Sequence, residues 1–186
     1  MGVGLIPGGG GLAYIARRAA EMAGAGNAGA DIFAFLKDGF TSAAMAKVGT
    51  SAHESRKLGY LLDTDTLVAH KDELLYVASQ EARAMFEAGY RPPLKRLFPV
   101  AGRNAKATIQ GQLVNMRDGG FISQHDFHIS SLIADVVTGG DVDAGSLVSE
   151  EYLMSLERKH FCALLDHPKT QERIMGMLQT GKPVRN

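Results

Sequence analysis

Apolar residues recur along most of the chain at intervals of three and four, which is the spacing of one face of an α-helix. The pattern is clearest over residues 71–88, and Gly89 is a natural stop for that helix. The pattern therefore predicts an amphipathic helix there and a chain that is mostly α. The positions on its apolar face are Leu74, Leu75, Ala78, Ala82, Met85 and Phe86.

The other helices are predicted from the same spacing and from residues that begin and end helices. Asp31 can cap a short helix that Gly39 stops, and Ser51 with Glu54 forms the pattern of a capping box. Three prolines make residues 90–102 a connector rather than a helix or a central strand. The predicted helices cover residues 12–23, 32–38, 41–47, 105–118, 123–138 and 170–179, with two more that start at Ser51 and Ser149.

A glycine-rich stretch opens the chain. The apolar residues Val3, Leu5 and Ile6 predict the end of a strand, and Pro7 and four glycines (residues 8–11) separate it from the first helix. Free N–H groups at the start of that helix can make a site for an anion beside bare backbone. The glycines equally permit a sharp turn where a strand and a helix pack closely, and glycine content alone favours the turn.

Several segments resemble the enoyl-CoA hydratase/isomerase (crotonase) superfamily. Residues 2–11, GVGLIPGGGG, are similar to the family's E-x-x-x-G-x-x-P-G-x-G-G segment, and residues 51–61 are similar to its S-A-x-E-A-x-x-L-G-L-V segment. Residues 89–93, 115–123 and 169–183 are similar to the C-terminal hydratase-like part of long bacterial 3-hydroxyacyl-CoA dehydrogenase fusions of fatty-acid β-oxidation. The resemblance covers nearly the whole chain.

The resemblance implies the helical C-terminal part of a crotonase-like (ClpP/crotonase) α/β domain that lacks most of its β-spiral core. It divides the chain into the end of the crotonase core, with a strand remnant and the glycine loop (1–90), a proline-rich connector (91–104) and a C-terminal helical subdomain (105–186). Helical faces that cover the absent core would be exposed or would pair with a second copy. We therefore expect a homo-oligomer.

The resemblance also implies a substrate, an acyl-CoA thioester. In the family, backbone N–H groups polarise the thioester carbonyl and two glutamates activate the water that adds across the double bond. The motif's glutamate falls one place before Met1, so no catalytic residue is expected in this chain. Gly8 matches the glycine whose N–H helps to position the water, and Lys182 lies near a coenzyme A-binding lysine, although Met177 stands where the family has an aromatic residue. NAD belongs to the dehydrogenase part of a fusion, and no cofactor is expected in this segment.

Composition narrows the class of protein further. Hydrophobic residues make up 45% of the chain, charged residues 22%, and the formal net charge is zero, which gives no reason to expect nucleic acid or an anionic membrane as a partner. No apolar run approaches the roughly 20 residues of a membrane span. The start resembles no export signal, and the lone Cys162 fits a reducing compartment, so we expect a cytoplasmic protein. The apolar neighbours of Cys162 predict a core thiol.

Two groups of ionisable residues allow more than one interpretation. Residues 91–117 hold six Lys and Arg and no acid, which suits coenzyme A phosphates or, as we favour, a solvated segment that pairs with the acidic helices after it. His125 and His128 are one helical turn apart, as zinc ligands can be, but no third ligand stands at a diagnostic spacing. We expect no metal, and a structural or surface role for His160 and His167.

Two functions from different classes remain open. The first is the C-terminal segment of an enoyl-CoA hydratase/3-hydroxyacyl-CoA dehydrogenase, catalytically incomplete as it stands because the catalytic glutamates lie upstream. The second is a non-catalytic helical module that oligomerises or binds a partner, such as a separately encoded N-terminal half.

Overall fold

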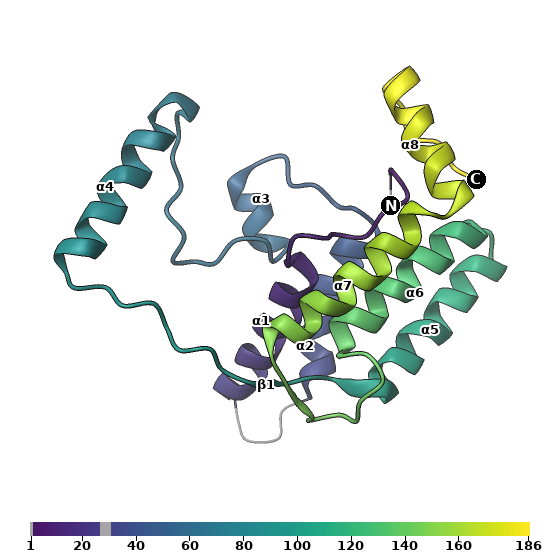
Figure 1. Cartoon of the computed structure of the whole chain (residues 1–186), viewed down its shortest axis with the longest axis horizontal. Helices are drawn as coiled ribbons and strands as arrows, with labels where there is room; N and C mark the ends of the chain where they lie inside the picture. Colours follow the sequence, from purple (N-terminus) through teal and green to yellow (C-terminus); the bar gives the residue numbers. More distant parts are fainter. Residues whose placement is uncertain (1, 27–30) are drawn as a thin grey trace. The chain divides into compact units, whose positions relative to one another are not determined.

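The computed structural model describes residues 2–26 and 31–186, and the chain divides into two compact units (Figure 1). Unit 1 comprises Met1–Val48 and Leu97–Asn186, and unit 2 comprises Gly49–Arg96. The division into a crotonase-core end (1–90), a connector (91–104) and a helical subdomain (105–186) stays a prediction. The predicted mostly helical character is confirmed.

In its described residues, unit 1 consists of helices and one short ladder of two antiparallel strands, in which Phe98 lies opposite Val148 and Pro99 opposite Leu147. Among the described residues, no helix is long and apolar enough to cross a bilayer. The elements in chain order are α1 (Gly11–Gly26), α2 (Ile32–Ala44), β1 (Phe98–Pro99), α5 (Gly102–Asp118), α6 (Gln124–Thr138), β2 (Leu147–Val148), α7 (Glu150–Leu165) and α8 (Pro168–Thr180).

Helix α6 is the central helix of unit 1, since α1, α2, α5 and α7 all pack against it. The Ser123 hydroxyl accepts a hydrogen bond from the Asp126 N–H, and the Asp126 carboxylate accepts one from the Ser123 N–H, so a complete capping box begins the helix. Gly139 ends it in the left-handed conformation. These boundaries agree with the helix predicted at residues 123–138. Its buried apolar side chains are Ile129, Ile133, Ala134, Val136 and Val137.

Helix α2 corrects two of the predictions. Gly39 does not stop it, and the two helices expected at residues 32–38 and 41–47 are one helix. A side chain at Gly39 would place its Cβ 2.7 Å from a methyl of Ile15, so the glycine allows α1 and α2 to approach closely. That contact offsets the cost of about 1 kcal/mol that a glycine imposes inside a helix. Asp31 caps α2 as predicted, by accepting from the Phe33 N–H.

The strand expected from Val3, Leu5 and Ile6 is wrong, because residues 2–7 form a turn and irregular backbone. A strand needs a partner for its backbone groups, and here the Gly4 carbonyl instead accepts a hydrogen bond from the Thr170 hydroxyl at 2.8 Å. Ile6 is still buried in the core of unit 1. Its apolar character therefore reflects burial rather than strand pairing.

The prediction that Cys162 is a core thiol is also wrong, because Cys162 is exposed. The buried side chains of α7 are Leu153, Glu157 and Leu164. At about 3.6 residues per turn, position 162 lies away from the stripe that these three define. Apolar neighbours in the sequence do not place a residue on the buried face of a helix.

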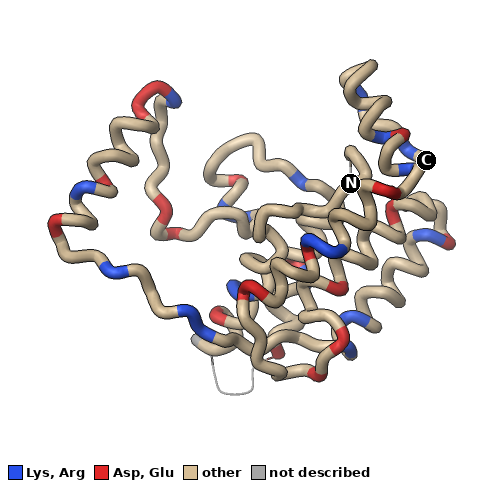
Figure 2. The backbone as a smooth tube through the Cα atoms, in the orientation of Figure 1, with Lys and Arg blue, Asp and Glu red and all other residues tan. Residues whose placement is uncertain are grey.

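Unit 2 contains α3 (Ala52–Lys57), a single 3-10 turn η1 (Lys71–Glu73) and α4 (Leu74–Glu87), and none of their residues is buried. The helix predicted at residues 71–88 is confirmed, but its apolar face is uncovered, with Leu75 80% exposed and Phe86 83% exposed. Acidic and basic residues alternate along α4 (Figure 2). Ser51 caps α3 as predicted, although the Glu54 carboxylate accepts from Thr50 rather than closing the capping box.

Two glycines of unit 1 with similar backbone conformations should respond differently to alanine. Gly145 (φ 83°) has open space where a Cβ would lie, whereas a Cβ at Gly102 (φ 73°) would collide with the backbone of Ala144. We expect Gly145→Ala to cost about 1 kcal/mol of unfolding free energy from the left-handed conformation alone. We expect Gly102→Ala to cost a further ~1–3 kcal/mol from the collision. Urea unfolding measures both, and equal losses would contradict the placement of residue 144 against the start of α5.

Candidate functional site

The start of α1 is an anion site, and the anion is a side chain of the same chain. The carboxylate of Glu157 on α7 accepts hydrogen bonds from the N–H of Gly10 at 2.8 Å, of Leu12 at 2.8 Å and of Ala13 at 2.9 Å. These N–H groups have no partner within a helix, and Glu157 is only 1% exposed. The glycine loop therefore brings backbone donors to a buried charge from 144 to 147 residues away.

Gly8, the residue expected to position a water, lies in the exposed part of the same loop. A Cβ at Gly8 would lie 2.8 Å from the ring of Phe161 on α7, so a larger residue at this position would displace the loop or the ring. Lys182 is exposed just after α8, and its N–H donates to the Thr180 hydroxyl at 3.2 Å. Gly8 and Lys182 lie on different segments of unit 1, and their roles in binding stay predictions.

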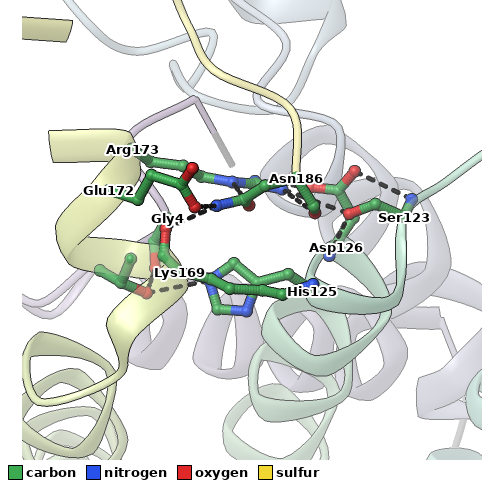
Figure 3. A network of polar contacts seen from close by, with 9 residues as sticks. Gly4, Ser123, His125, Asp126, Lys169, Glu172, Arg173 and Asn186 are labelled. Atoms are coloured by element: carbon green, nitrogen blue, oxygen red, sulfur yellow. Dashed lines mark hydrogen bonds and ion pairs between the residues drawn. The ribbon is translucent and has the colours of Figure 1, made fainter. Parts of the chain in front are cut away.

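A second polar site joins α6 to α8 and the end of the chain (Figure 3). The guanidinium of Arg173, 1% exposed, donates to Asp126 Oδ1 at 2.7 Å, to the Ser123 hydroxyl at 3.2 Å and to Asn186 Oδ1 at 2.8 Å. Burial raises the pKa of Asp126, but the hydrogen bonds from Arg173 and Ser123 outweigh this and lower it overall. Arg173 and Asp126 thus form a buried, charge-assisted hydrogen-bonded pair that joins α8 to α6.

His125 makes the other buried contact between α6 and α8. Its Nε2 lies 3.0 Å from the hydroxyl of Thr170, which in turn donates to the Gly4 carbonyl (Figure 3). Because the hydroxyl hydrogen points at Gly4, the imidazole must donate, so neutral His125 carries its proton on Nε2. Burial, together with nearby Arg173 and other cationic groups, lowers the pKa of His125 from 6.5 to about 4.

Two further histidines gather beside His125. The ring centroid of His167 lies 4.5 Å from that of His125 and 5.6 Å from that of His128. His167 also caps α8, since its Nδ1 accepts from the Lys169 N–H at 3.2 Å. The three rings, together with Gln124 and Lys169, line a hollow of about 240 Å³. Among the described residues, no group of three or more His, Cys, Asp or Glu side chains is placed to hold a metal ion.

The basic segment of residues 91–117 pairs with later acids where it enters unit 1. Arg103 lies 3.6 Å from Asp141 and 3.3 Å from Asp143, and Lys106 donates to Asp135. Asp135 is also held by His160 at 2.6 Å, and the hydrogen bonds from His160 and Lys106 lower its pKa to about 2. These contacts favour the interpretation of a paired segment, and they give His160 the structural role expected of it.

Comparison with known proteins gives one informative relative. The chain is 40% identical over 185 residues to the "Probable 3-hydroxyacyl-CoA dehydrogenase" of Bacillus subtilis (strain 168). The match takes in all of this chain but only 23% of that protein, so the chain spans about a quarter of its relative's length. No protein-family model matches the chain, and no solved structure matches it significantly.

Removing the charge of Glu157 should destabilise the chain. In Glu157→Gln one of the two accepting oxygens becomes an amide donor that faces a backbone N–H, so we expect a loss of about 1.5–3 kcal/mol of unfolding free energy. The control is Glu150→Gln at the exposed first turn of α7, where loss of the interaction with the helix dipole should cost under about 1 kcal/mol. Urea unfolding measures both, and equal losses would argue against the buried contact.

The stability of unit 1 should fall as pH falls from about 6.5 towards 4. The pKa of His125 is about 4 in the folded chain and near 6.5 when unfolded, so the unfolded chain takes up the proton first. The stabilisation from neutral His125 is complete above pH 6.5 and decreases through this window. In His125→Gln, an amide can still donate to Thr170, and the dependence on pH should be shallower. His70→Gln, an exposed site in unit 2, should keep the original slope in denaturation curves recorded at several pH values.

Proposed function

We propose that residues 1–186 form the helical C-terminal part of the enoyl-CoA hydratase half of a fusion with 3-hydroxyacyl-CoA dehydrogenase, acting in cytoplasmic fatty-acid β-oxidation. The observation that carries the proposal is the 40% identity to the Bacillus subtilis protein along the full chain. The printed name of that relative speaks only of the dehydrogenase. We infer the hydratase half from the crotonase-like segments at residues 2–11 and 51–61.

The contacts at the start of α1 support a non-catalytic role for this chain within the proposed enzyme. The N–H groups of residues 10, 12 and 13 are already bonded to Glu157, so they do not offer free donors to a thioester oxygen. In the proposed enzyme the oxyanion-binding groups and the two glutamates that activate water come from polypeptide outside these residues. Gly8 and Lys182 are the positions of this chain that would meet the acyl-CoA, and NAD would bind in the dehydrogenase part.

The uncovered face of α4 supports an interface in the assembled enzyme. Leu74, Leu75 and Phe86 are all more than half exposed, and an apolar stripe of this kind is usually covered in a functional assembly. We therefore retain the homo-oligomer as part of the proposal, with the crotonase core as the other candidate cover.

A non-catalytic helical module is the second candidate, and the core of unit 1 favours it. Ile129, Ile133 and Leu153 are fully buried within this chain, as expected of a unit that can fold without further polypeptide. Such a module would oligomerise or bind a separate partner instead of completing a hydratase.

The proposal predicts that the 186 residues alone do not hydrate crotonyl-CoA. Loss of general acid–base catalysis costs roughly 10²–10⁴ in rate and loss of an oxyanion donor roughly 10²–10³. Loss of the enoyl-thioester absorbance measures turnover, with an intact crotonase-family hydratase as the positive control. Turnover within tenfold of that enzyme would contradict the proposal.

A deletion distinguishes the two candidate functions. Removing the matching region from the Bacillus subtilis relative should abolish hydration of crotonyl-CoA while NAD-dependent oxidation of a 3-hydroxyacyl-CoA persists. If hydration survives the deletion, or if the full-length relative never shows it, the module interpretation replaces the hydratase one. Size-exclusion chromatography of the isolated chain then tests self-association, and a compact stable monomer would count against it.

A further inference from the structure

We propose that the hollow lined by His125, His128, His167, Lys169 and Gln124 binds a divalent tetrahedral oxyanion of the phosphate and sulfate class. Three imidazoles, one ammonium group and one amide face a space of about 240 Å³, which is roughly eight times the volume that a water molecule occupies in the liquid. All five side chains can donate hydrogen bonds, although His125 can do so only from Nδ1 when its ring is protonated, because its Nε2–H is donated to Thr170. This site is separate from the glycine loop and does not depend on the proposed hydratase role.

The charges around the hollow favour an anion. The groups that lower the pKa of His125 by their charge are Arg173, His167, His128 and Lys169, and those that act on His128 are His167 and His160, so every one is cationic or can become so. No carboxylate lines the hollow. The two buried or half-buried acids of α6 are engaged, Asp126 with Arg173 and Asp135 with Lys106 and His160. Of the side chains that line the hollow, Lys169 carries a full positive charge and none is negative.

The arrangement of the rings favours an anion over a metal ion. The rings of His125 and His167 are stacked with an interplanar angle of 24°, and those of His125 and His128 with an angle of 22°. Stacked rings do not direct their nitrogens at one point, as a tetrahedral metal requires. His125 Nε2 and His167 Nδ1 are also already used, by Thr170 and by the Lys169 N–H. A larger oxyanion can accept from donors that are spread around it.

Binding should be linked to proton uptake. The pKa of His125 and of His128 is lowered, which keeps these rings neutral near pH 7. A bound dianion stabilises the imidazolium forms, so the affinity should rise as pH falls. The ionisable groups that line the hollow or act on its histidines are His125, His128, His160, His167, Lys169 and Arg173. The acids beside these groups are Asp126, bonded to Arg173, Asp135, bonded to His160, and Asp166, which precedes His167 in the sequence.

Inorganic sulfate is the first probe, because it remains divalent from pH 5.5 to 7.5. The chain is titrated with sodium sulfate at constant ionic strength held by chloride, and binding is followed by the NMR signals of the histidine Cε1–H groups, assigned from single His→Gln variants. We expect saturable shifts of His128 and His167, with binding about tenfold tighter at pH 5.5 than at pH 7.5. No saturable shift at pH 5.5, or shifts equal to those of His53 and His70, would overturn the proposal.

Two exposed substitutions test the assignment of the side chains. We expect Lys169→Gln to weaken sulfate binding about tenfold and His128→Gln to reduce its dependence on pH. Matched controls are Lys71→Gln and His70→Gln in unit 2, which should bind like the original chain. Because residues 128 and 169 are exposed, thermal unfolding should be nearly unchanged. Unaltered affinity in Lys169→Gln and an unaltered pH dependence in His128→Gln would refute the site.

The same titration with inorganic phosphate and with glycerol 2-phosphate separates two sources of the oxyanion. Tighter binding of the monoester would identify the phosphoryl group of an organic molecule as the ligand, and tighter binding of inorganic phosphate would identify the free ion. Binding of sulfate with neither phosphate compound would contradict the proposed class, because the two groups share their charge and shape.

Discussion

The carboxylate of Glu157 at the start of α1 is the contact on which the arrangement of unit 1 depends. A buried ionised carboxylate is costly unless it is hydrogen-bonded, and the first N–H groups of a helix are costly unless they find an acceptor. Each group supplies what the other lacks. Since Glu157 lies in the middle of α7, this pairing fixes α7 across the end of α1, and α1 in turn packs on α2 and α6. The glycine loop is the part of the chain that makes this approach sterically possible.

Helix α8 is held by the same kind of interaction rather than by apolar burial. Its only fully buried residues are Thr170 and Arg173, both polar. Arg173 is bonded to Asp126 and the terminal Asn186, while Thr170 links His125 to the Gly4 carbonyl. Such a network is strong while every member has its partner, and it loses much of its value when one member is removed or changes its charge. The neutral state of His125 is therefore part of the docking of α8, and the ends of the chain meet in the same network.

The sequence predicts well those features that depend on neighbouring residues. The caps at Asp31, Ser51 and Ser149, the bounds of the helix at residues 123–138 and the amphipathic character of α4 all follow from contacts within about one helical turn. The predictions that fail are those that depend on contacts with residues distant in the sequence. Gly39 is read as a stop because the contact with Ile15 is not visible locally, and His167 is missed because it joins His125 only when α8 folds back on α6. Glycine content favours a plain turn at the start of α1, yet the loop also holds an anion, and no local pattern shows that Glu157 supplies it.

The resemblance to the crotonase superfamily implies that these helices cover an absent crotonase core, and the two units support that interpretation to different degrees. Unit 1 contains its own core around α6, with Ile109, Ile129 and Leu164 buried by other parts of the same unit. Those apolar faces need no further cover. The spacing of apolar residues in unit 1 is therefore explained without an absent crotonase core. Helix α4 is the opposite case, because its apolar face is as regular as that of a core helix and yet, in the part of the chain that the structure describes, none of its residues is buried. A pattern of that regularity costs solubility unless something covers it. The argument for a larger assembly therefore depends on α4. Unit 1 has a core of its own and does not need that assembly to bury its apolar residues.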